Sequence, residues 1–227
     1  MHFSAIVTAN VFAAATSLTT SVDAHAYLLQ PPIQFTTRDK NMYAYVVPAG
    51  KVPPASSYAA TGVEFNHQAF VANYNKLNPA SLKAFILANE VRAESSSNGG
   101  TAECGYSKMD QPALPLPAQI EFGNYKLSNR EGIHPGPCEA WCDDEVVVPL
   151  TMDCRTLLNK PIPYAKDKCV GKNRLSFYWL ASHVAPFQVH IGCAPIAGSA
   201  ARAMSADDVD TETRSIDFGA LSNSTTF

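Results

Sequence analysis

Apolar runs divide the chain into short β-prone segments that are separated by polar or proline-rich stretches. The clearest strand patterns come last, over residues 174–181 (RLSFYWLA) and 186–196 (PFQVHIGCAPI). Four earlier segments have a similar β-prone composition: 41–47, 118–122, 138–142 and 145–150. Short strands between turns rich in Pro and Gly favour an all-β fold, an antiparallel β-sandwich with long loops.

One segment predicts a helix, residues 81–91. Its apolar Leu82, Phe85 and Ile86 recur at helical spacing, and the segment opens with a serine that suits an N-cap. Residues 62–65 predict a further short strand. Breaks or loops are expected where Pro and polar residues gather: 52–57, 111–117 and 159–168.

The two ends of the chain differ from its middle in composition. Residues 1–24 hold an apolar run followed by small residues, which predicts a secretory signal peptide cleaved just before His25. Residues 198–227 are small, polar and acidic, and they predict a disordered tail with a glycosylation sequon at Asn223. The expected domain therefore covers residues 25–197.

Charge and hydropathy exclude some classes of function. The whole chain has a net charge of −3, and residues 25–197 are nearly neutral, with 15 Lys and Arg against 14 Asp and Glu. No basic surplus indicates nucleic-acid binding, and no second apolar run is long enough to span a bilayer. We therefore expect a soluble, secreted monomer that binds neither nucleic acid nor membrane.

Six cysteines lie within the expected domain: Cys104, Cys138, Cys142, Cys154, Cys169 and Cys193. An even number of cysteines behind a signal peptide predicts three disulfides formed in an oxidising compartment. A zinc site would favour paired C-x-x-C units, and the sequence has none. The spacing alone does not choose among the possible pairings.

Histidines carry the candidate chemistry. Cleavage would expose the α-amine of His25, and an α-amine, whose reference pKa is about 7.7–8.0, can chelate a metal ion together with an imidazole nitrogen. His134 precedes a Pro-Gly-Pro turn that holds its ring in place. Gln188 and His190 share one face of the last strand, and His183 lies in the bend before that strand.

In this order, these residues resemble the pattern of a known family. A cleaved N-terminal His25, a His-x-Gly-Pro turn at His134, and a final strand with Gln and Cys-Ala over residues 188–194 are similar to the motifs of lytic polysaccharide monooxygenases. The opening HAYLLQP and the six cysteines look most like the pectin-active branch from oomycetes. The resemblance implies a secreted copper enzyme on an immunoglobulin-like β-sandwich.

The resemblance also implies roles for the histidines. The α-amine and Nδ1 of His25 and Nε2 of His134 would bind one copper ion as a histidine brace. Gln188 matches a glutamine that hydrogen-bonds the oxygen species, and His183 could assist it. His190 stands where the family usually has an axial Tyr, so it could be a third imidazole ligand or a nearby hydrogen-bond donor, unless it only forms a polar face of the strand.

The same resemblance implies the reaction, its partners and the disulfides. An external electron donor would reduce the copper, which would use dioxygen or hydrogen peroxide to oxidise a plant cell-wall polysaccharide, with pectic homogalacturonan as the expected substrate. The family branch implies disulfides Cys104–Cys193 and Cys154–Cys169, which leaves Cys138 to pair with Cys142.

Several alternatives stay open at this point. The protein could be a non-catalytic copper-binding protein for transport or scavenging, with His190 as an extra ligand, or a wall-binding module without a metal.

Single residues also have alternative roles. His67, expected on a loop, competes with His134 as second ligand. Tyr27 and Tyr43 face substrate or are buried. The acidic run at 143–145 is expected to form a solvated turn rather than a glycosidase pair, and no Gly-x-Ser-x-Gly elbow indicates a serine hydrolase.

Overall fold

A computed structural model describes residues 25–36, 43–59, 61–96, 99–124 and 133–198. The predicted signal peptide, the predicted tail with its sequon, and the first two residues of the expected strand at 41–47 lie outside the described residues. None of the helices within the described ranges is long and apolar enough to cross a membrane.

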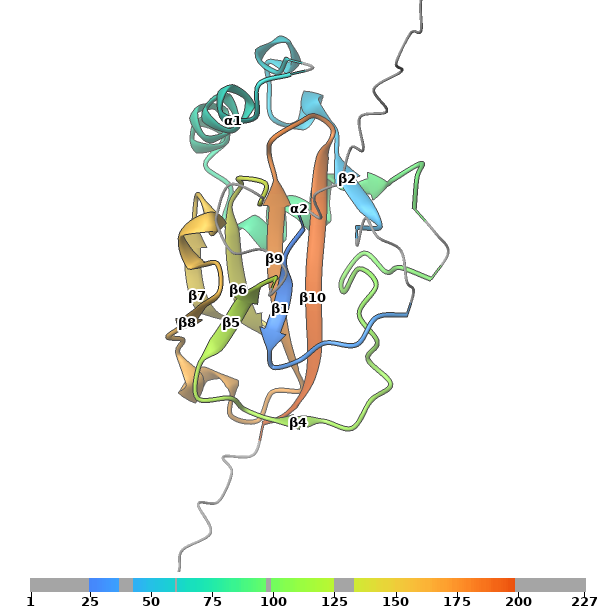
Figure 1. Cartoon of the computed structure of the whole chain (residues 1–227), viewed down its shortest axis with the longest axis vertical. Helices are drawn as coiled ribbons and strands as arrows, with labels where there is room; N and C mark the ends of the chain where they lie inside the picture. The colour runs from blue at the N-terminus through green and yellow to red at the C-terminus, as the bar shows by residue number, and fades with distance from the viewer. Residues whose placement is uncertain (1–24, 37–42, 60, 97–98, 125–132, 199–227) are drawn as a thin grey trace, which may run out of the picture.

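Two sheets form a mainly β, sandwich-like fold (Figure 1). The smaller sheet has the order β1-β5-β8, with these bounds: Tyr27–Gln30, Ile120–Gly123 and Lys160–Ile162. The larger sheet has the order β3-β2-β10-β9-β6-β7, with these bounds: Val91–Arg92, Tyr45–Val47, Phe187–Ala197, Arg174–Ala181, Cys138–Cys142 and Glu145–Thr151. All of these neighbouring strands are antiparallel, which confirms the expected sheet type. The short β4 (Leu114–Pro115) pairs in parallel with the end of β10.

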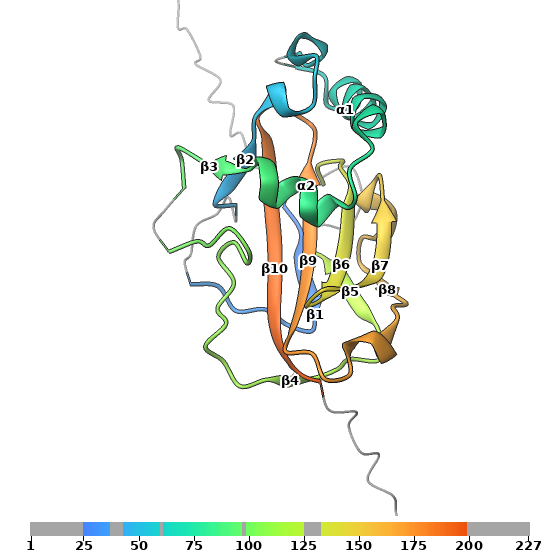
Figure 2. The ribbon, with the colours of Figure 1, turned by 180° about the vertical axis from the view of Figure 1, so that it is seen from behind.

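Helix α2 (Leu82–Asn89) crosses the outer face of the larger sheet, on the side away from the smaller sheet (Figure 2). Ser81 caps it, because the Ser81 side chain accepts a hydrogen bond of 2.9 Å from the backbone N–H of Ala84. The predicted helix is therefore confirmed. Short 3-10 turns complete the described elements: η1 (Ala49–Lys51), η2 (Ala55–Ser57), η4 (Cys154–Leu157) and η5 (Lys166–Cys169).

Helix α1 (Val63–Leu77) was not predicted from the sequence, and the strand expected at 62–65 is wrong. The helix buries Phe70 and Tyr74, but three other buried positions on it are polar: Asn66, His67 and Asn73. Polar residues on the buried face hide the apolar period that identifies an amphipathic helix. Helix α1 lies at the same end of the molecule as the turn between β9 and β10 (Figure 1).

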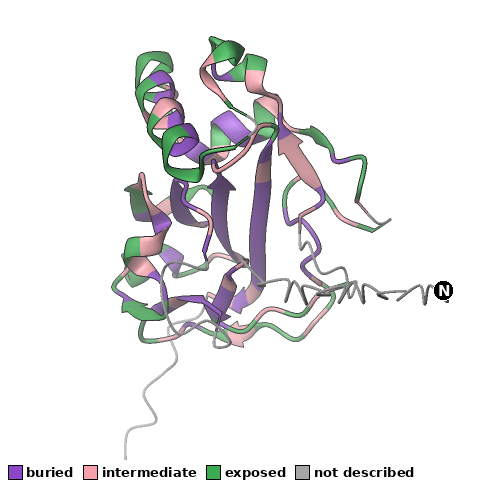
Figure 3. Cartoon of the chain, turned by 45° about the horizontal axis from the view of Figure 1, so that its top comes forward, coloured by how far each residue is buried: buried purple, intermediate pink, exposed green. Residues whose placement is uncertain are grey.

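Strand β9 is buried on both faces, which explains its continuous apolar sequence (Figure 3). Phe177 and Trp179 point into the core between the two sheets, whereas Tyr178 and Leu180 belong to the second core beneath the helices. Successive side chains of a strand alternate between faces, so one strand supplies both cores. Burial of this strand therefore couples the sheets to the helices.

The three disulfides join the cysteines in a pattern that only partly agrees with the expectation. Cys104–Cys193 is confirmed. The expected Cys138–Cys142 and Cys154–Cys169 are wrong, because Cys138 pairs with Cys154 and Cys142 with Cys169. Cys138 and Cys142 stand at opposite ends of the extended β6, about 13 Å apart at the usual rise of a strand, and a disulfide requires Cα atoms within about 7 Å. Three disulfides are typical of a protein that folds in an oxidising compartment.

The carboxyl group of Glu90 is buried where α2 ends. Both its oxygens are shielded from solvent, and neither has a hydrogen-bond partner in the described part of the chain. Burial raises the pKa of Glu90 from 4.5 to about 8. The protonated carboxyl is therefore the form that the fold accommodates at neutral pH.

Glu90 should make the stability depend on pH. Between pH 4.5 and 8 the folded chain keeps a proton that the unfolded chain has released, so the free energy of unfolding should fall as the pH rises through this range. Glu90→Gln removes the charge and should flatten this dependence in urea unfolding measured from pH 4 to 9. The exposed Glu94→Gln should keep the wild-type dependence, and an unchanged slope in Glu90→Gln would contradict the assignment.

Candidate metal centre

His25 lies just before β1, where the smaller sheet meets β10. The side chain of Asn124, only 1% exposed, donates a hydrogen bond of 2.8 Å from Nδ2 to the backbone carbonyl of His25. The backbone N–H of Asn124 in turn donates to Oδ1 of Asn159 at 3.0 Å. The buried amide of Asn124 thus fixes the backbone of His25 against the smaller sheet.

Gln188 lies beside the imidazole of His25. Nε2 of His25 is 3.4 Å from Oε1 of Gln188. An amide oxygen only accepts hydrogen bonds, so this contact favours the neutral tautomer with the proton on Nε2 and the lone pair on Nδ1. Nδ1 is the atom that a chelate with the α-amine requires.

His134 lies in an extended segment that leads into β6 and runs along the end of β9. The carbonyl of Pro135 accepts from the backbone N–H of Ser182 at 2.8 Å, and the carbonyl of Pro137 accepts from that of Leu180 at 3.0 Å. A Cβ atom on Gly136 would overlap the carbonyl of Leu180. Glycine at this position therefore permits the close approach that sets the place of His134.

The imidazoles of His25, His134 and His183 meet at one end of the sandwich. The rings of His25 and His134 are 5.3 Å apart, edge to face, and the ring of His183 stacks on that of His134 at 3.5 Å with an angle of 7° between the planes. Burial, and after it the neighbouring His183 and His25, lower the pKa of His134 to about 3. Burial and His25 lower the pKa of His183 to about 4. Both rings are therefore neutral at neutral pH, the form in which imidazole binds metals.

His190 lies on β10 directly opposite Trp179 on β9, and its ring stacks on the indole at 4.4 Å. The same ring is 5.0 Å from the ring of His25 and 5.5 Å from that of Tyr43. His190 is 5% exposed, so it forms part of the wall beneath His25. The structure thus brings His190 close to the centre through the register of two core strands.

Within the described residues, no group of three or more His, Cys, Asp or Glu side chains is arranged to hold a metal ion. His25 and His134 thus supply two imidazoles, and His190 does not complete a three-residue cluster with them. A brace needs only two imidazoles with the α-amine of His25 as the third donor. Three neutral nitrogen donors suit copper, so the residues present fit that ion.

The remaining candidates of the sequence have structural positions away from the centre. His67 is on helix α1, not on a loop, and its Nδ1 is bonded to the hydroxyl of Ser182 at 2.8 Å, so the structure does not bring it to His25 as a ligand. Tyr27 packs edge to face on Phe35. Asp143 forms the turn between β6 and β7 and accepts two backbone hydrogen bonds, as expected for a structural turn.

Sequence reasoning missed the residues that hold the imidazoles in place. The side chains of Asn124 and Asn66 are buried and donate hydrogen bonds to the backbone carbonyls of His25 and His183. The buried hydroxyl of Ser182 donates to the carbonyl of the residue that follows His134. Each is a common polar residue whose partner is distant in sequence, so no local motif identifies it.

Comparison with known proteins adds no assignment. No family model, curated protein or solved structure matches this chain. The function therefore has to be argued from the geometry of the centre and from the residues around it.

A groove of about 690 Å³ begins beside Tyr43 and extends along β2 and β3. Tyr43, Arg92 and Pro186 are among its lining residues. The ring of Tyr43 is 6.3 Å from that of His25, so the groove starts next to the imidazole cluster. The guanidinium of Arg92 lies 5.7 Å from the centre of the Tyr45 ring and donates to the carbonyl of Gly100 at 3.2 Å.

Gly136→Ala should destabilise the segment that carries His134 without removing any proposed copper donor. The added methyl group has to displace the carbonyl of Leu180, which we expect to lower the free energy of unfolding by about 1–3 kcal/mol. Gly50→Ala is the matched control, because nothing lies within 4 Å of a Cβ at that position. Chemical denaturation of both variants checks the prediction, and equal stabilities would show that this extended segment does not need its glycine.

Proposed function

We propose that the protein is a secreted, copper-dependent lytic polysaccharide monooxygenase on an immunoglobulin-like sandwich, and that it acts on pectic homogalacturonan. The observation that carries the proposal is the meeting of His25 and His134, which are far apart in the sequence and 5.3 Å apart as rings. The order of motifs around His25, His134 and Gln188 supports the same family. The three disulfides support secretion.

The donors would be the α-amine and Nδ1 of His25 and an imidazole nitrogen of His134. Bound copper would supply a one-electron centre that uses dioxygen or hydrogen peroxide, with an external electron donor, to abstract hydrogen from a sugar carbon. In the uncut chain the nitrogen of His25 is an amide joined to Ala24. Removal of residues 1–24 is therefore the step that creates the third donor.

The chain's own residues prepare the site for this chemistry. Gln188 accepts from Nε2 of His25, which keeps the Nδ1 lone pair available for binding. Asn124 holds the carbonyl of His25, so the first residue of the mature chain has a fixed backbone. His183 covers one face of the His134 ring and excludes water from that side.

The groove beside Tyr43 is the place where this geometry would receive the polysaccharide. It is open along β2 and β3, and its lining includes a cation, Arg92, and a carboxylate, Glu94, as well as Tyr43. A guanidinium pairs well with carboxylates such as those of galacturonate. We place the polyanionic substrate along this groove, so that a sugar near Tyr43 lies next to the imidazole cluster.

The proposal predicts that copper binding depends on the cut before His25. Protein that begins at His25 should bind one Cu(II) per chain in calorimetric titration. One additional N-terminal residue removes a donor atom, so it should weaken binding by more than the tenfold to hundredfold that is typical for loss of an outer-shell partner. Proteolytic removal of that residue should restore the affinity.

Two results would contradict this account. Equal affinity of the extended and cleaved proteins would show that the amine is not a donor. Tight copper binding without oxidised oligosaccharides from any glycan, in the presence of a reductant and peroxide, would instead support the non-catalytic copper carrier.

Arg92→Gln should distinguish a charged from a neutral polysaccharide. Loss of the guanidinium should raise the KM for homogalacturonan only a few-fold, because exposed ion pairs contribute up to about 1 kcal/mol. The rate on highly methyl-esterified pectin should stay nearly unchanged, because esterification removes the carboxylates that Arg92 would bind. Lys160→Gln, on the far edge strand β8, is the control for a general charge effect. Equal losses on both substrates would exclude carboxylate recognition by Arg92.

A further inference from the structure

The first turns of helix α1 reach both loops that carry the stacked imidazoles. Asn66, which is fully buried, donates from Nδ2 to the carbonyl of His183 at 2.8 Å. Its amide also forms two hydrogen bonds with the backbone of Ala59, at 2.8 and 2.9 Å. Both Nδ2 protons and the oxygen of Asn66 therefore have partners, and the backbone of His183 is held by a fully satisfied buried group.

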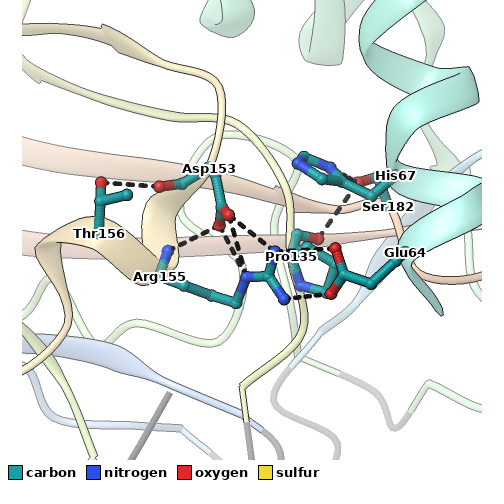
Figure 4. Close-up of polar contacts among 7 residues, drawn as sticks. All are labelled: Glu64, His67, Pro135, Asp153, Arg155, Thr156 and Ser182. Carbon is teal, nitrogen blue, oxygen red and sulfur yellow. Dashed lines mark hydrogen bonds and ion pairs between the residues drawn. The ribbon is translucent and has the colours of Figure 1, made fainter. Parts of the chain in front are cut away.

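The next residue of the helix, His67, acts on the other loop (Figure 4). Its Nδ1 lies 2.8 Å from the hydroxyl of Ser182, and that hydroxyl donates to the carbonyl of Pro135 at 3.2 Å. Since the only proton of the hydroxyl is used on the carbonyl, Nδ1 of His67 must be the donor to Ser182. The result is a directed chain from helix α1 to the residue that follows His134.

The chain is buried throughout, so water does not compete for its bonds. His67 is 7% exposed and Ser182 is fully buried. A buried hydroxyl that loses its donor leaves an unsatisfied group, and such a loss is expensive in a low-dielectric interior. Ser182 also donates its backbone N–H to the same carbonyl of Pro135, so both of its donors converge on one atom.

A second contact ties this end of α1 to the segment behind the centre. Arg155 on η4 pairs with Glu64 on the helix and with Asp153, its neighbour in sequence (Figure 4). Next to Arg155, Cys154 is joined to Cys138, the first residue of β6. The helix and the segment that follows His134 are thus attached to the same short stretch of chain.

We propose that the first turns of α1 are a positioning device for the imidazole pair: His67 and Ser182 hold His134, and Asn66 holds His183. These residues contact the backbone of the loops and none of the proposed copper donors. The prediction for copper affinity depends on the proposed function, whereas the prediction for the ring geometry does not.

His67→Phe and Ser182→Ala test the proposal by removing the donor and the relay hydroxyl. In mature protein that begins at His25, each should weaken Cu(II) binding about tenfold to a hundredfold in calorimetry, the usual effect of losing an outer-shell partner. Each should also shift the ring proton signals of His134 and His183 in NMR spectra, because rings 3.5 Å apart shield one another strongly. The amide of His67→Asn can replace the Nδ1 donor, so this variant should have nearly the wild-type copper affinity and nearly the wild-type ring signals.

Lys76→Gln, exposed near the other end of the same helix, is the control and should change neither quantity. Should His67→Phe fail to fold, Ser182→Ala removes a single oxygen and still provides the test. Unchanged ring signals in Ser182→Ala and His67→Phe would overturn the positioning role. If the wild-type mature protein binds no copper, the proposed function fails, and the ring signals alone decide whether the helix positions the pair.

Discussion

The structure depends on the antiparallel pairing of β9 with β10, which runs from Gln188 opposite Ala181 to Pro195 opposite Arg174. This register places His190 opposite Trp179 and Gln188 opposite Ala181, two residues nearer the end of the sandwich. The turn between the two strands carries Ser182 and His183. A shift of β10 by one residue would move Gln188 and His190 to the opposite face of the sheet, so packing of the core and geometry of the centre are set together.

Burial shapes the chemistry of the centre as much as proximity does. His134 and His183 stack in a site that disfavours positive charge, so both are neutral at ordinary pH. The backbone beside these rings is held by buried side chains, because Asn66 donates to the carbonyl of His183 and Ser182 donates to the carbonyl of Pro135. Neutral rings on a fixed backbone are ready to bind a metal ion without first losing protons.

The sequence predicts the elements that bury apolar residues in a regular pattern. Strands β6 and β9 have the predicted bounds, and the helix capped by Ser81 is where the spacing of Leu82, Phe85 and Ile86 puts it. Helix α1 was missed because its buried face contains Asn and His. These polar residues contribute hydrogen bonds to loops that are distant in sequence, and no local pattern reveals such partners.

For the candidate site too, the sequence reveals the residues of short motifs but not the contacts made between distant segments. His25, His134 and Gln188 belong to short motifs, and the structure brings them together. Resemblance to a family was a poor guide to the disulfides, because pairing depends on which cysteines face η4 and η5 from β6. It also did not foresee that His190 would stack on Trp179.

The most direct test of the central claim is electron paramagnetic resonance of the copper-loaded protein that begins at His25, compared with its His134→Ala variant. The account predicts coupling to three nitrogen donors, two of them imidazoles, with one imidazole lost in the variant. A spectrum that is the same in both proteins would contradict it, because His134 would then not be a ligand.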